Sequence, residues 1–531
     1  MSEEKRKQTT ISPAINKSSK EAEQSGTLAA SQPQIKGNRR SSQRRLISAV
    51  AWAGPKLGRL GPLRKALVNS WEKRARAGSQ REIETGLRPP GVTQDRTEMG
   101  IAIMHAIERT IAEGRIGRAG MDRLLNVLVG DSFVSHGIPS AKDRFKDQFG
   151  VRPPGFLLIS PTKTCNLRCE GCYADSGPTR EKLEWPIIDR MVREAREQWG
   201  AVFMVLSGGE PLVYEDEGKG VLDLAEQHPE TYFMMYTNGT LIDDDVARRL
   251  GKLGNLTPAI SVEGLGVETD KRRGQGVFDK VIAAMERLRR ERVIFGISMT
   301  ATRDNADLLL SDEVVDFYFD KMGATYGWVF HYMPIGRAFT LKMLPTPEQR
   351  LRMWQRAWQL VYERHIFIAD FWNSGTAALG CVSAGHQGGY LTVDWNGAVS
   401  PCVFVPYSPM NIHDLYDQGK TLTDAWRHPF LARMRDWQEE YSNEHSFTPG
   451  SRHGNWMMPC PIRDHYAEFY RMLTEFKPEP VDENAKAAML DPEYQKGMEE
   501  YNRAVAELFE PIWKSKYMQG NQKLKSAGKL P

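Results

Sequence analysis

The sequence has little that indicates a membrane or extracellular protein. Its 531 residues contain no run of 18 or more apolar residues, so we expect no membrane-spanning helix. The first apolar stretch begins near Leu46, after a long polar segment, and no secretory signal is expected at the N-terminus. Internal repeats are absent too. With 40% hydrophobic and 26% charged residues, the composition predicts a globular, cytoplasmic protein of two or three domains.

Cysteine is also scarce, and its distribution is uneven. The six cysteines form two groups of three, which are Cys165, Cys169 and Cys172, and Cys381, Cys402 and Cys460. A disulfide-linked secreted protein of this size would not usually hold half of its cysteines within eight residues. Metal or redox chemistry in a reducing compartment fits this pattern better than disulfide bonding does.

The first group has a spacing that limits its chemistry. Cys165-Asn-Leu-Arg-Cys169-Glu-Gly-Cys172 offers three thiolates and no fourth. Structural zinc sites normally close with four ligands. An iron–sulfur cluster held by three thiolates instead keeps one iron open for a small ligand. The spacing therefore favours a cluster with an open position.

From residue 155 the hydrophobic pattern alternates between strands and helices. The runs predicted as strands are Phe156–Ser160, Val202–Leu206, Tyr232–Tyr236, Pro258–Val262, Val293–Met299 and Gly327–Tyr332. Five helical runs separate them, which predicts parallel βαβ units. The pattern alone does not choose between an open sheet and a partial barrel. In either architecture the ligand site lies at the carboxyl ends of the strands.

Polar and glycine residues follow these strands. Ser207-Gly-Gly-Glu210-Pro comes directly after the second strand, where its glycines, Gly208 and Gly209, permit close backbone approach and its carboxylate can accept hydrogen bonds from an ammonium group. Other candidates at strand ends, or in the turn after the fourth strand, are Asn238, Ser261, Arg272, Arg273 and Thr300. An arginine suits a carboxylate ligand, although a solvated basic turn is the alternative for both.

The cysteine loop, read with the Ser-Gly-Gly-Glu-Pro segment one βα unit later, resembles the radical S-adenosylmethionine (radical SAM) superfamily. The resemblance implies an α/β fold with a partial (β/α)₆ TIM-like barrel. It also implies a [4Fe–4S] cluster on the first three cysteines whose open iron binds SAM. The expected reaction is reductive cleavage of SAM and abstraction of hydrogen from an unactivated C–H bond.

The same resemblance implies contacts with SAM. Glu210 would contact the amino group, Ser261 the ribose or carboxylate side, and Arg272 or Arg273 the carboxylate. The family often places an aromatic residue for adenine before the third cysteine. This chain has Gly171 there, and Tyr173 follows the cysteine instead.

The second cysteine group surrounds a predicted hairpin. Asn396-Gly397 is a strong turn signal between two short strands, with Cys402 just beyond. The segment resembles the SPASM/twitch extensions of radical SAM enzymes, and three cysteines favour the twitch form with one auxiliary [4Fe–4S] cluster. Its fourth position would be filled by His386 or Asp464, or stay open to bind substrate. An electron conduit and a zinc site with one histidine are alternatives.

These patterns divide the chain into six segments. We expect a disordered tail (1–45), a helical, basic amphipathic extension (46–150), the radical SAM core (151–340), a helical connector (341–380), a small α+β auxiliary-cluster domain (381–466) and a helical C-terminal tail (467–531). Residues 36–76 hold twelve Lys or Arg against one acid, Glu72. Such a stretch can contact an anionic membrane surface peripherally, or pack on its own domain.

The preferred function is a radical SAM enzyme acting on a lipid, an isoprenoid or another small molecule. The first alternative is a peptide- or protein-modifying maturase of the SPASM type, and the second is a non-catalytic, metal-stabilised binding module. The expected partner is a low-potential electron donor of the flavodoxin or ferredoxin type. No nucleic-acid partner is expected.

Overall fold

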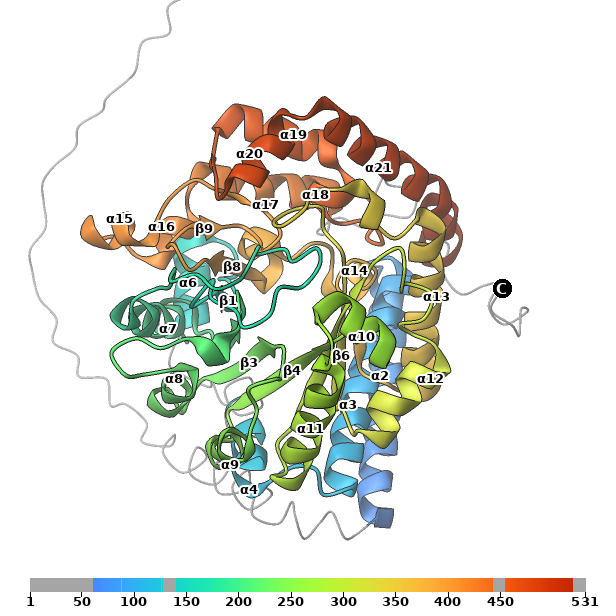
Figure 1. Ribbon diagram of the computed structural model, residues 1–531. Coiled ribbons are helices and arrows are strands. Elements are labelled where there is room, and N and C mark those ends of the chain that lie inside the picture. The colour runs from blue at the N-terminus through green and yellow to red at the C-terminus, as the bar shows by residue number, and fades with distance from the viewer. Residues whose placement is uncertain (1–60, 87, 126, 128–139, 443–453, 519–531) are drawn as a thin grey trace, which may run out of the picture.

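A nine-stranded sheet forms the centre of the computed structural model, which describes residues 61–518 except 87, 126, 128–139 and 443–453 (Figure 1). The strand order is β7-β6-β5-β4-β3-β2-β1-β8-β9. Every neighbouring pair in this sheet is parallel except β8 with β9. The disordered tail expected at residues 1–45, and most of the basic stretch at 36–76, lie outside the described residues.

The first six strands form the predicted barrel. They are β1 Phe156–Ile159, β2 Phe203–Leu206, β3 Tyr232–Thr237, β4 Leu256–Val262, β5 Gly296–Ala301 and β6 Tyr326–His331. The helices around them are α7 Trp185–Trp199, α8 Val221–Gln227, α9 Asp244–Leu253, α10 Gly266–Arg273, α11 Val277–Arg290 and α12 Asp312–Val315, which continues as η3 Asp316–Lys321. The α/β class and the partial (β/α)₆ barrel are therefore confirmed, with the fifth strand starting three residues later than expected.

Local signals explain where these helices begin and end. In α9, the Asp243 side chain accepts a hydrogen bond from the Val246 N–H, and Gly254 ends the helix in the left-handed region at a φ of 68°. α7 ends in the same way at Gly200. Glycine suits both positions because a left-handed backbone carries no penalty without a Cβ.

The sheet continues beyond the six predicted strands. β7 Ile368–Asp370 pairs with β6, and β8 Tyr390–Val393 pairs in parallel with β1. β9 Val399–Ser400 returns antiparallel to β8, which confirms the hairpin at Asn396-Gly397. One sheet thus crosses the boundaries that the sequence placed at residues 340 and 380. The division into domains stays a prediction.

Helices form the remainder of the described chain. Before the barrel these are α2 Gly61–Thr85, α3 Pro90–Ala112, α4 Arg118–Arg123 and α6 Ala141–Phe149; after β6 come η4 Leu341–Met343, α13 Pro347–Arg364, α14 Gly375–Ala378 and η5 Ser383–Gly388. The C-terminal part contains α15 Ile412–Asp417, α16 Leu422–Trp426, α17 Pro429–Ser442, α18 Pro461–Asp464, α19 Tyr466–Phe476, α20 Glu483–Leu490, α21 Pro492–Ile512, η6 Trp513–Met518 and a small ribbon of β10 Tyr407–Ser408 with β11 Glu479–Pro480.

α2 and α3 lie side by side, and α3 packs against α13 and α14 (Figure 1). Within the described ranges, no helix combines the length and apolar character that crossing a bilayer requires.

The junction of β1 and β8 gives a test of the extended sheet. The Gly155 N–H donates to the Gly389 carbonyl at 2.8 Å, and a Cβ on Gly155 would lie 2.0 Å from the Gly388 carbonyl oxygen. Because this neighbour is backbone, we expect Gly155→Ala to lower the free energy of unfolding by about 1–3 kcal/mol. Thermal unfolding monitored by circular dichroism measures the change.

Gly78→Ala is the matched control, since a Cβ on Gly78 in α2 would meet nothing within 4 Å. Alanine there should raise stability, by about 1 kcal/mol or less, because it favours a helix over glycine. Equal melting temperatures for Gly155→Ala and the native chain would show that the β1–β8 junction is wrongly placed.

Candidate active site

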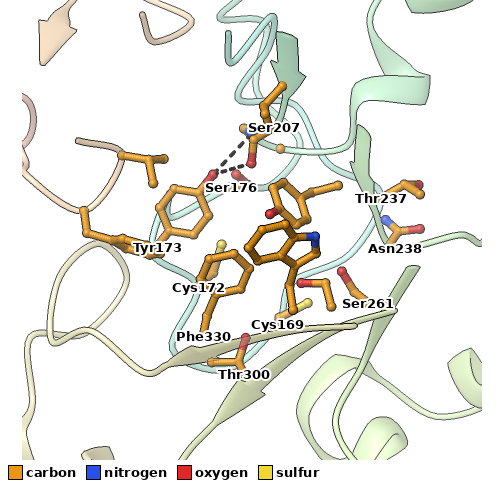
Figure 2. Close-up of a pocket in the computed structure, with 18 of the residues that line it drawn as sticks. Cys169, Cys172, Tyr173, Ser176, Ser207, Thr237, Asn238, Ser261, Thr300 and Phe330 are labelled. Atoms are coloured by element: carbon orange, nitrogen blue, oxygen red, sulfur yellow. Dashed lines mark hydrogen bonds between the residues drawn. The ribbon is translucent and has the colours of Figure 1, made fainter. Parts of the chain in front are cut away.

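A cavity of about 270 Å³ lies inside the barrel, and its polar lining comes from the carboxyl ends of the strands and the loops that follow them (Figure 2). All three cysteines of the first group line it. So do nine of the ten residues predicted to bind the cofactor, which are Tyr173, Ser207, Gly208, Gly209, Asn238, Ser261, Arg272, Arg273 and Thr300. Glu210 is the exception. The structure therefore brings together residues that span 135 positions of the sequence.

The cysteine loop is held by its backbone and by hydrogen bonds to sulfur. The Cys165 N–H donates to the Gly177 carbonyl at 2.9 Å. The Leu167 N–H lies 3.4 Å and the Asn238 Nδ2 3.9 Å from the Cys165 Sγ, and the Arg273 Nη1 lies 3.9 Å from the Cys169 Sγ. Such donors stabilise thiolate charge and shift the reduction potential of a bound cluster.

The spacing of the sulfur atoms fits a cluster better than one metal ion. In a tetrahedral zinc site, Zn–S bonds of about 2.3 Å place the sulfurs about 3.8 Å apart. Among the described residues, one set of three ligand atoms from His, Cys, Asp or Glu lies within 4.8 Å of one another. That set contains no cysteine. In each cysteine group at least two sulfurs therefore lie more than 4.8 Å apart, which is wider than the sulfurs around one zinc ion.

Gly171 is required by the space around it. Its φ is 59°, and a Cβ there would lie 2.7 Å from the Tyr332 ring. An aromatic side chain at position 171 would therefore clash, and Tyr332 fills the space on the cavity wall instead. No sequence signal marked Tyr332, because the approach of this side chain to the cysteine loop depends on the path of the chain after β6.

Tyr173 does reach the cavity, but its hydroxyl is already bonded. Its Oη lies 2.9 Å from the Ser207 Oγ and accepts the Gly208 N–H at 3.3 Å (Figure 2). Burial raises the pKa of Tyr173 above its ordinary range, so the phenol stays protonated. The tyrosine therefore ties the cysteine loop to the glycine-rich segment and presents its ring to the cavity.

The glycine-rich segment pairs with the cysteine loop through its backbone. The Gly209 N–H donates to the Thr162 carbonyl at 2.8 Å, and the Glu210 N–H donates to the Thr164 carbonyl at 2.9 Å. A Cβ on Gly209 would lie 2.2 Å from the Thr164 carbonyl oxygen. This approach explains why the sequence needs glycine here, and it fixes the second strand against the loop that carries the cysteines.

Glu210 is fully buried beside the cavity rather than in its lining. Its Oε1 accepts hydrogen bonds from the Thr237 Oγ1 at 2.7 Å and the Leu212 N–H at 3.1 Å, and its Oε2 accepts the Asn238 N–H at 2.8 Å. Burial raises the pKa of Glu210, and these hydrogen bonds oppose that effect. In this structure the carboxylate orients Thr237 and Asn238, in contrast to the direct ligand contact expected from the sequence.

Arg272 and Arg273 lie in the cavity wall but share a buried partner. Both guanidinium groups pair with the Glu263 carboxylate, Arg273 through its Nε at 2.9 Å. Glu263 directly follows β4. A contact of either arginine with SAM stays a prediction, and in this structure both compensate the charge of Glu263, which is 0% exposed.

Aromatic side chains form much of the remaining lining. They are Phe156, Phe203, Tyr236, Trp328, Phe330, Phe371, Tyr390 and Phe404. Phe404 and Tyr390 come from the C-terminal part of the chain, so that part completes the wall of the barrel cavity. The result is a water-poor interior with polar groups concentrated at the end that carries the cysteines.

A buried histidine also lines the cavity, and sequence analysis did not single it out. The Nε2 of His331, at the end of β6, lies 2.9 Å from the Asp370 Oδ2 at the end of β7. Burial lowers the pKa of His331 to about 4 despite this carboxylate, so the imidazole is neutral near pH 7. No sequence signal marked this pair, because β6 and β7 are joined through α13.

The second cysteine group lies behind the cavity wall. None of Cys381, Cys402 and Cys460 lines the cavity, yet the Tyr390 hydroxyl, whose ring does line it, lies 3.0 Å from the Cys402 Sγ. Burial raises the pKa of all three thiols, that of Cys402 to about 12, and the neighbouring Cys381 further raises the pKa of Cys402 and of Cys460. Buried thiols of this kind ionise readily only beside a cation, which is what a metal centre supplies.

The structure distinguishes the two candidates for a fourth ligand to this group. Asp464 forms a fully buried ion pair with Arg350, whose Nη2 lies 3.2 Å from the Asp464 Oδ2, and the Oδ2 also accepts the Cys460 N–H at 3.2 Å. Removing Asp464 from Arg350 would leave a buried charge without compensation. The Nδ1 of His386 lies 3.1 Å from the Cys381 carbonyl, close to the group. His386 is therefore the stronger candidate.

His331 yields a prediction about acid stability. Since its folded pKa of about 4 lies below the unfolded value of 6.5, the unfolded chain binds the proton more readily between these values. Stability is therefore complete above about pH 6.5 and falls by up to about 3 kcal/mol as the pH drops to 4. We expect His331→Gln, which can still donate to Asp370, to lose less stability over this range.

Melting temperatures measured at pH 7, 5.5 and 4.5 test this expectation. His413→Gln is the control, because the His413 side chain is 37% exposed and pairs with Glu184 on the surface. It should change the pH profile far less than His331→Gln does. Identical profiles for the native chain and His331→Gln would contradict the buried, neutral state of His331.

Comparisons with known proteins agree with this architecture. Residues 159–306 match the family profile described as the radical SAM superfamily. The mycofactocin maturase MftC of Mycolicibacterium smegmatis is 29% identical over 316 residues, which cover 55% of this chain and 75% of that protein. The Fe-coproporphyrin III synthase of Methanosarcina barkeri is 27% identical over 160 residues, which cover 30% of this chain and 40% of that protein. Among solved structures, SuiB of Streptococcus suis bound to the precursor peptide SuiA has a TM-score of 0.45 and 17% identity, over 55% of this chain and 70% of that one.

Proposed function

The chain is a member of the radical SAM superfamily, and from this premise we propose that it is a maturase that abstracts hydrogen from a peptide or protein substrate in the barrel cavity. The observation that carries the proposal is the convergence of the cysteine loop, the glycine-rich segment and an aromatic cavity at one end of the barrel. When bound, a [4Fe–4S] cluster and SAM together supply an electron and a carbon radical that removes a hydrogen atom.

Cys165, Cys169 and Cys172 are the proposed ligands of that cluster. Donors to two of their sulfurs come from Asn238 and Arg273, which hold the thiolates in place. The ligands proposed for SAM are the lining residues around this loop, namely Tyr173, Ser207, Gly208, Gly209, Asn238, Ser261 and Thr300. Arg272, Arg273 and Glu210 are proposed to hold these residues and the cysteine loop without touching SAM, because each is already bonded to a protein partner.

The aromatic wall would control what reaches the radical. Its rings exclude water, which protects a reactive species from side reactions. The neutral imidazole of His331 lies in the same cavity wall, and Asp370 fixes its orientation. A substrate group held against this wall would meet an apolar surface with one uncharged imidazole.

The second group, Cys381, Cys402 and Cys460, is proposed to hold one auxiliary [4Fe–4S] cluster. Because Tyr390, Val403 and Phe404 stand between these cysteines and the cavity, we favour a role in electron transfer over direct substrate binding. The sulfur spacing makes the zinc alternative the weaker one. Reduction of the first cluster needs an external donor, for which a flavodoxin or ferredoxin is proposed.

The choice of a peptide or protein substrate over a lipid depends on the relatives. The match to a protein named as a maturase extends over three quarters of that protein, whereas the match to the Fe-coproporphyrin III synthase covers 40% of it. The lipid or isoprenoid hypothesis was based on the basic stretch at 36–76, of which only 61–76 is described, as part of α2. Membrane contact through that stretch therefore has no support from the described residues.

Cysteine substitutions test the assignment of both clusters. Anaerobically reconstituted native chain should contain about eight irons, while Cys169→Ala and Cys402→Ala should each contain about four. With dithionite, Cys169→Ala should form no 5′-deoxyadenosine, because its SAM-binding cluster is lost. Cys402→Ala should still cleave SAM, because its first cluster is intact. Iron analysis and chromatography of the products measure both results.

The outcomes separate the proposed roles. SAM cleavage by Cys169→Ala at the native rate would refute the first cluster. Eight irons in Cys402→Ala would refute the auxiliary cluster while leaving the first assignment unaffected. A native chain with full iron content and no SAM cleavage would favour the non-catalytic binding module.

Glu210 allows a separate test of how the SAM site is held. In Glu210→Gln, an NH₂ group replaces one acceptor oxygen. That NH₂ group then faces another donor, either the Asn238 N–H or the Thr237 hydroxyl, and no hydrogen bond forms between the two donors. We expect at least about tenfold weaker SAM binding, because losing one charge-assisted hydrogen bond costs about 1.5–3 kcal/mol. Iron content should not change. Equilibrium dialysis with labelled SAM measures the affinity, and Glu215→Gln at an exposed position is the control.

Equal SAM affinity for Glu210→Gln, Glu215→Gln and the native chain would show that Glu210 does not support the site. A loss of iron in Glu210→Gln would point to a role in the cysteine loop instead.

A further inference from the structure

A third group of metal-ligand side chains, separate from both cysteine groups, lies outside the lining of the barrel cavity. Glu72 on α2, His105 on α3 and His365, directly after α13, place their ligand atoms within 4.8 Å of one another. None of the three lines the cavity. We propose that they form a binding site for a divalent transition-metal ion, with zinc as the reference ion.

The three residues come from different parts of the chain. Glu72 is on α2, His105 is on α3, and His365 follows α13, 260 residues after His105. The His105 Nε2 lies 3.3 Å from the Glu72 Oε2. The two imidazole rings stack at 4.4 Å between centroids, with an angle of 12° between their planes, so one ring must turn about its Cβ–Cγ bond before both nitrogens can direct their in-plane lone pairs at one ion. Two imidazole nitrogens and one carboxylate oxygen are ligands that zinc accepts at 2.0–2.2 Å, as is usual for sites that keep a position for water.

The surroundings hold each ligand in place. Arg76 donates to the Glu72 Oε1 from its Nε at 3.2 Å and its Nη2 at 3.1 Å, so the Oε2 is the atom that faces His105. The backbone of His365 is held by Arg109, whose Nη2 donates to the His365 carbonyl at 2.8 Å. Second partners of this kind orient metal ligands in known sites.

One ligand residue also keeps an unsatisfied ring nitrogen. The His365 Nδ1 is buried without a hydrogen-bond partner of normal geometry among the described residues.

The position indicates what the ion would do. α2 and α3 belong to the helical segment before the barrel, and α13 leads directly into β7 at the edge of the sheet (Figure 1). An ion shared by all three elements would fasten the N-terminal helices to the barrel. The Arg76 charge beside Glu72 is balanced by its pairing with Glu98, which keeps the site able to accept a cation.

The test uses the anaerobically reconstituted full-length chain with zinc chloride as the probe, followed by desalting. We expect one zinc per chain in addition to unchanged iron. X-ray absorption at the zinc edge should show nitrogen and oxygen neighbours at about 2.0–2.1 Å and no sulfur at 2.3 Å. His105→Gln and Glu72→Gln should bind zinc at least about a hundredfold more weakly in competition with a chromophoric chelator, since each removes one of three protein ligands.

His413→Gln is the matched control, because His413 and Glu184 form a surface histidine–carboxylate pair at 2.8 Å. It should bind zinc as the native chain does. Zinc should also raise the melting temperature of the native chain but not that of His105→Gln, which separates lost binding from lost folding.

Three results would overturn the proposal: no zinc retained by the native chain, equal affinity in His105→Gln, or sulfur in the zinc shell, which would place the ion on the cysteines. SAM cleavage measured on the same samples keeps this outcome separate from the proposed function, because none of these results depends on it.

Discussion

The pairing of β1 on both of its edges is the constraint on which the rest of the site depends. This strand has only four residues, Phe156–Ile159, and it pairs in parallel with β2 on one side and β8 on the other. The cysteine loop leaves its carboxyl end, the glycine-rich segment leaves β2, and Cys402 follows the β8–β9 hairpin. A shift in the register of β1 would therefore displace both cysteine groups and the cavity between them.

Hydrogen bonds then connect the loops at that end of the barrel. Gly209 and Glu210 bind the backbone of the cysteine loop, and the Glu210 carboxylate holds Asn238, whose amide reaches the Cys165 sulfur. Donors that are fixed in this way need little reorganisation when charge develops at a bound group. The aromatic lining below them lowers the local polarity, which strengthens each of these interactions.

Much of the barrel could be predicted because its signals are local. All six predicted strands are present, since hydrophobic periodicity and the glycines that end helices such as α7 and α9 are visible in one sequence. The sequence did not show which distant residue each side chain meets. Arg272 and Arg273 both pair with the buried Glu263, which no local pattern indicated. Position 171 looked like a missing aromatic residue until Tyr332 proved to occupy the space.

The sequence by itself determined the order of strands and helices, the two cysteine groups and the polar segments at the ends of the strands. These features can be predicted because the spacing of cysteines along a short loop determines how many thiolates the loop offers to one metal centre. The period of the hydrophobic residues likewise indicates whether a segment forms a helix or a strand. Only the tertiary structure decided that β8 joins the barrel sheet, that Tyr390 links the cavity wall to Cys402, and that Glu72, His105 and His365 meet. Those contacts join residues tens to hundreds of positions apart, and packing in three dimensions chooses them.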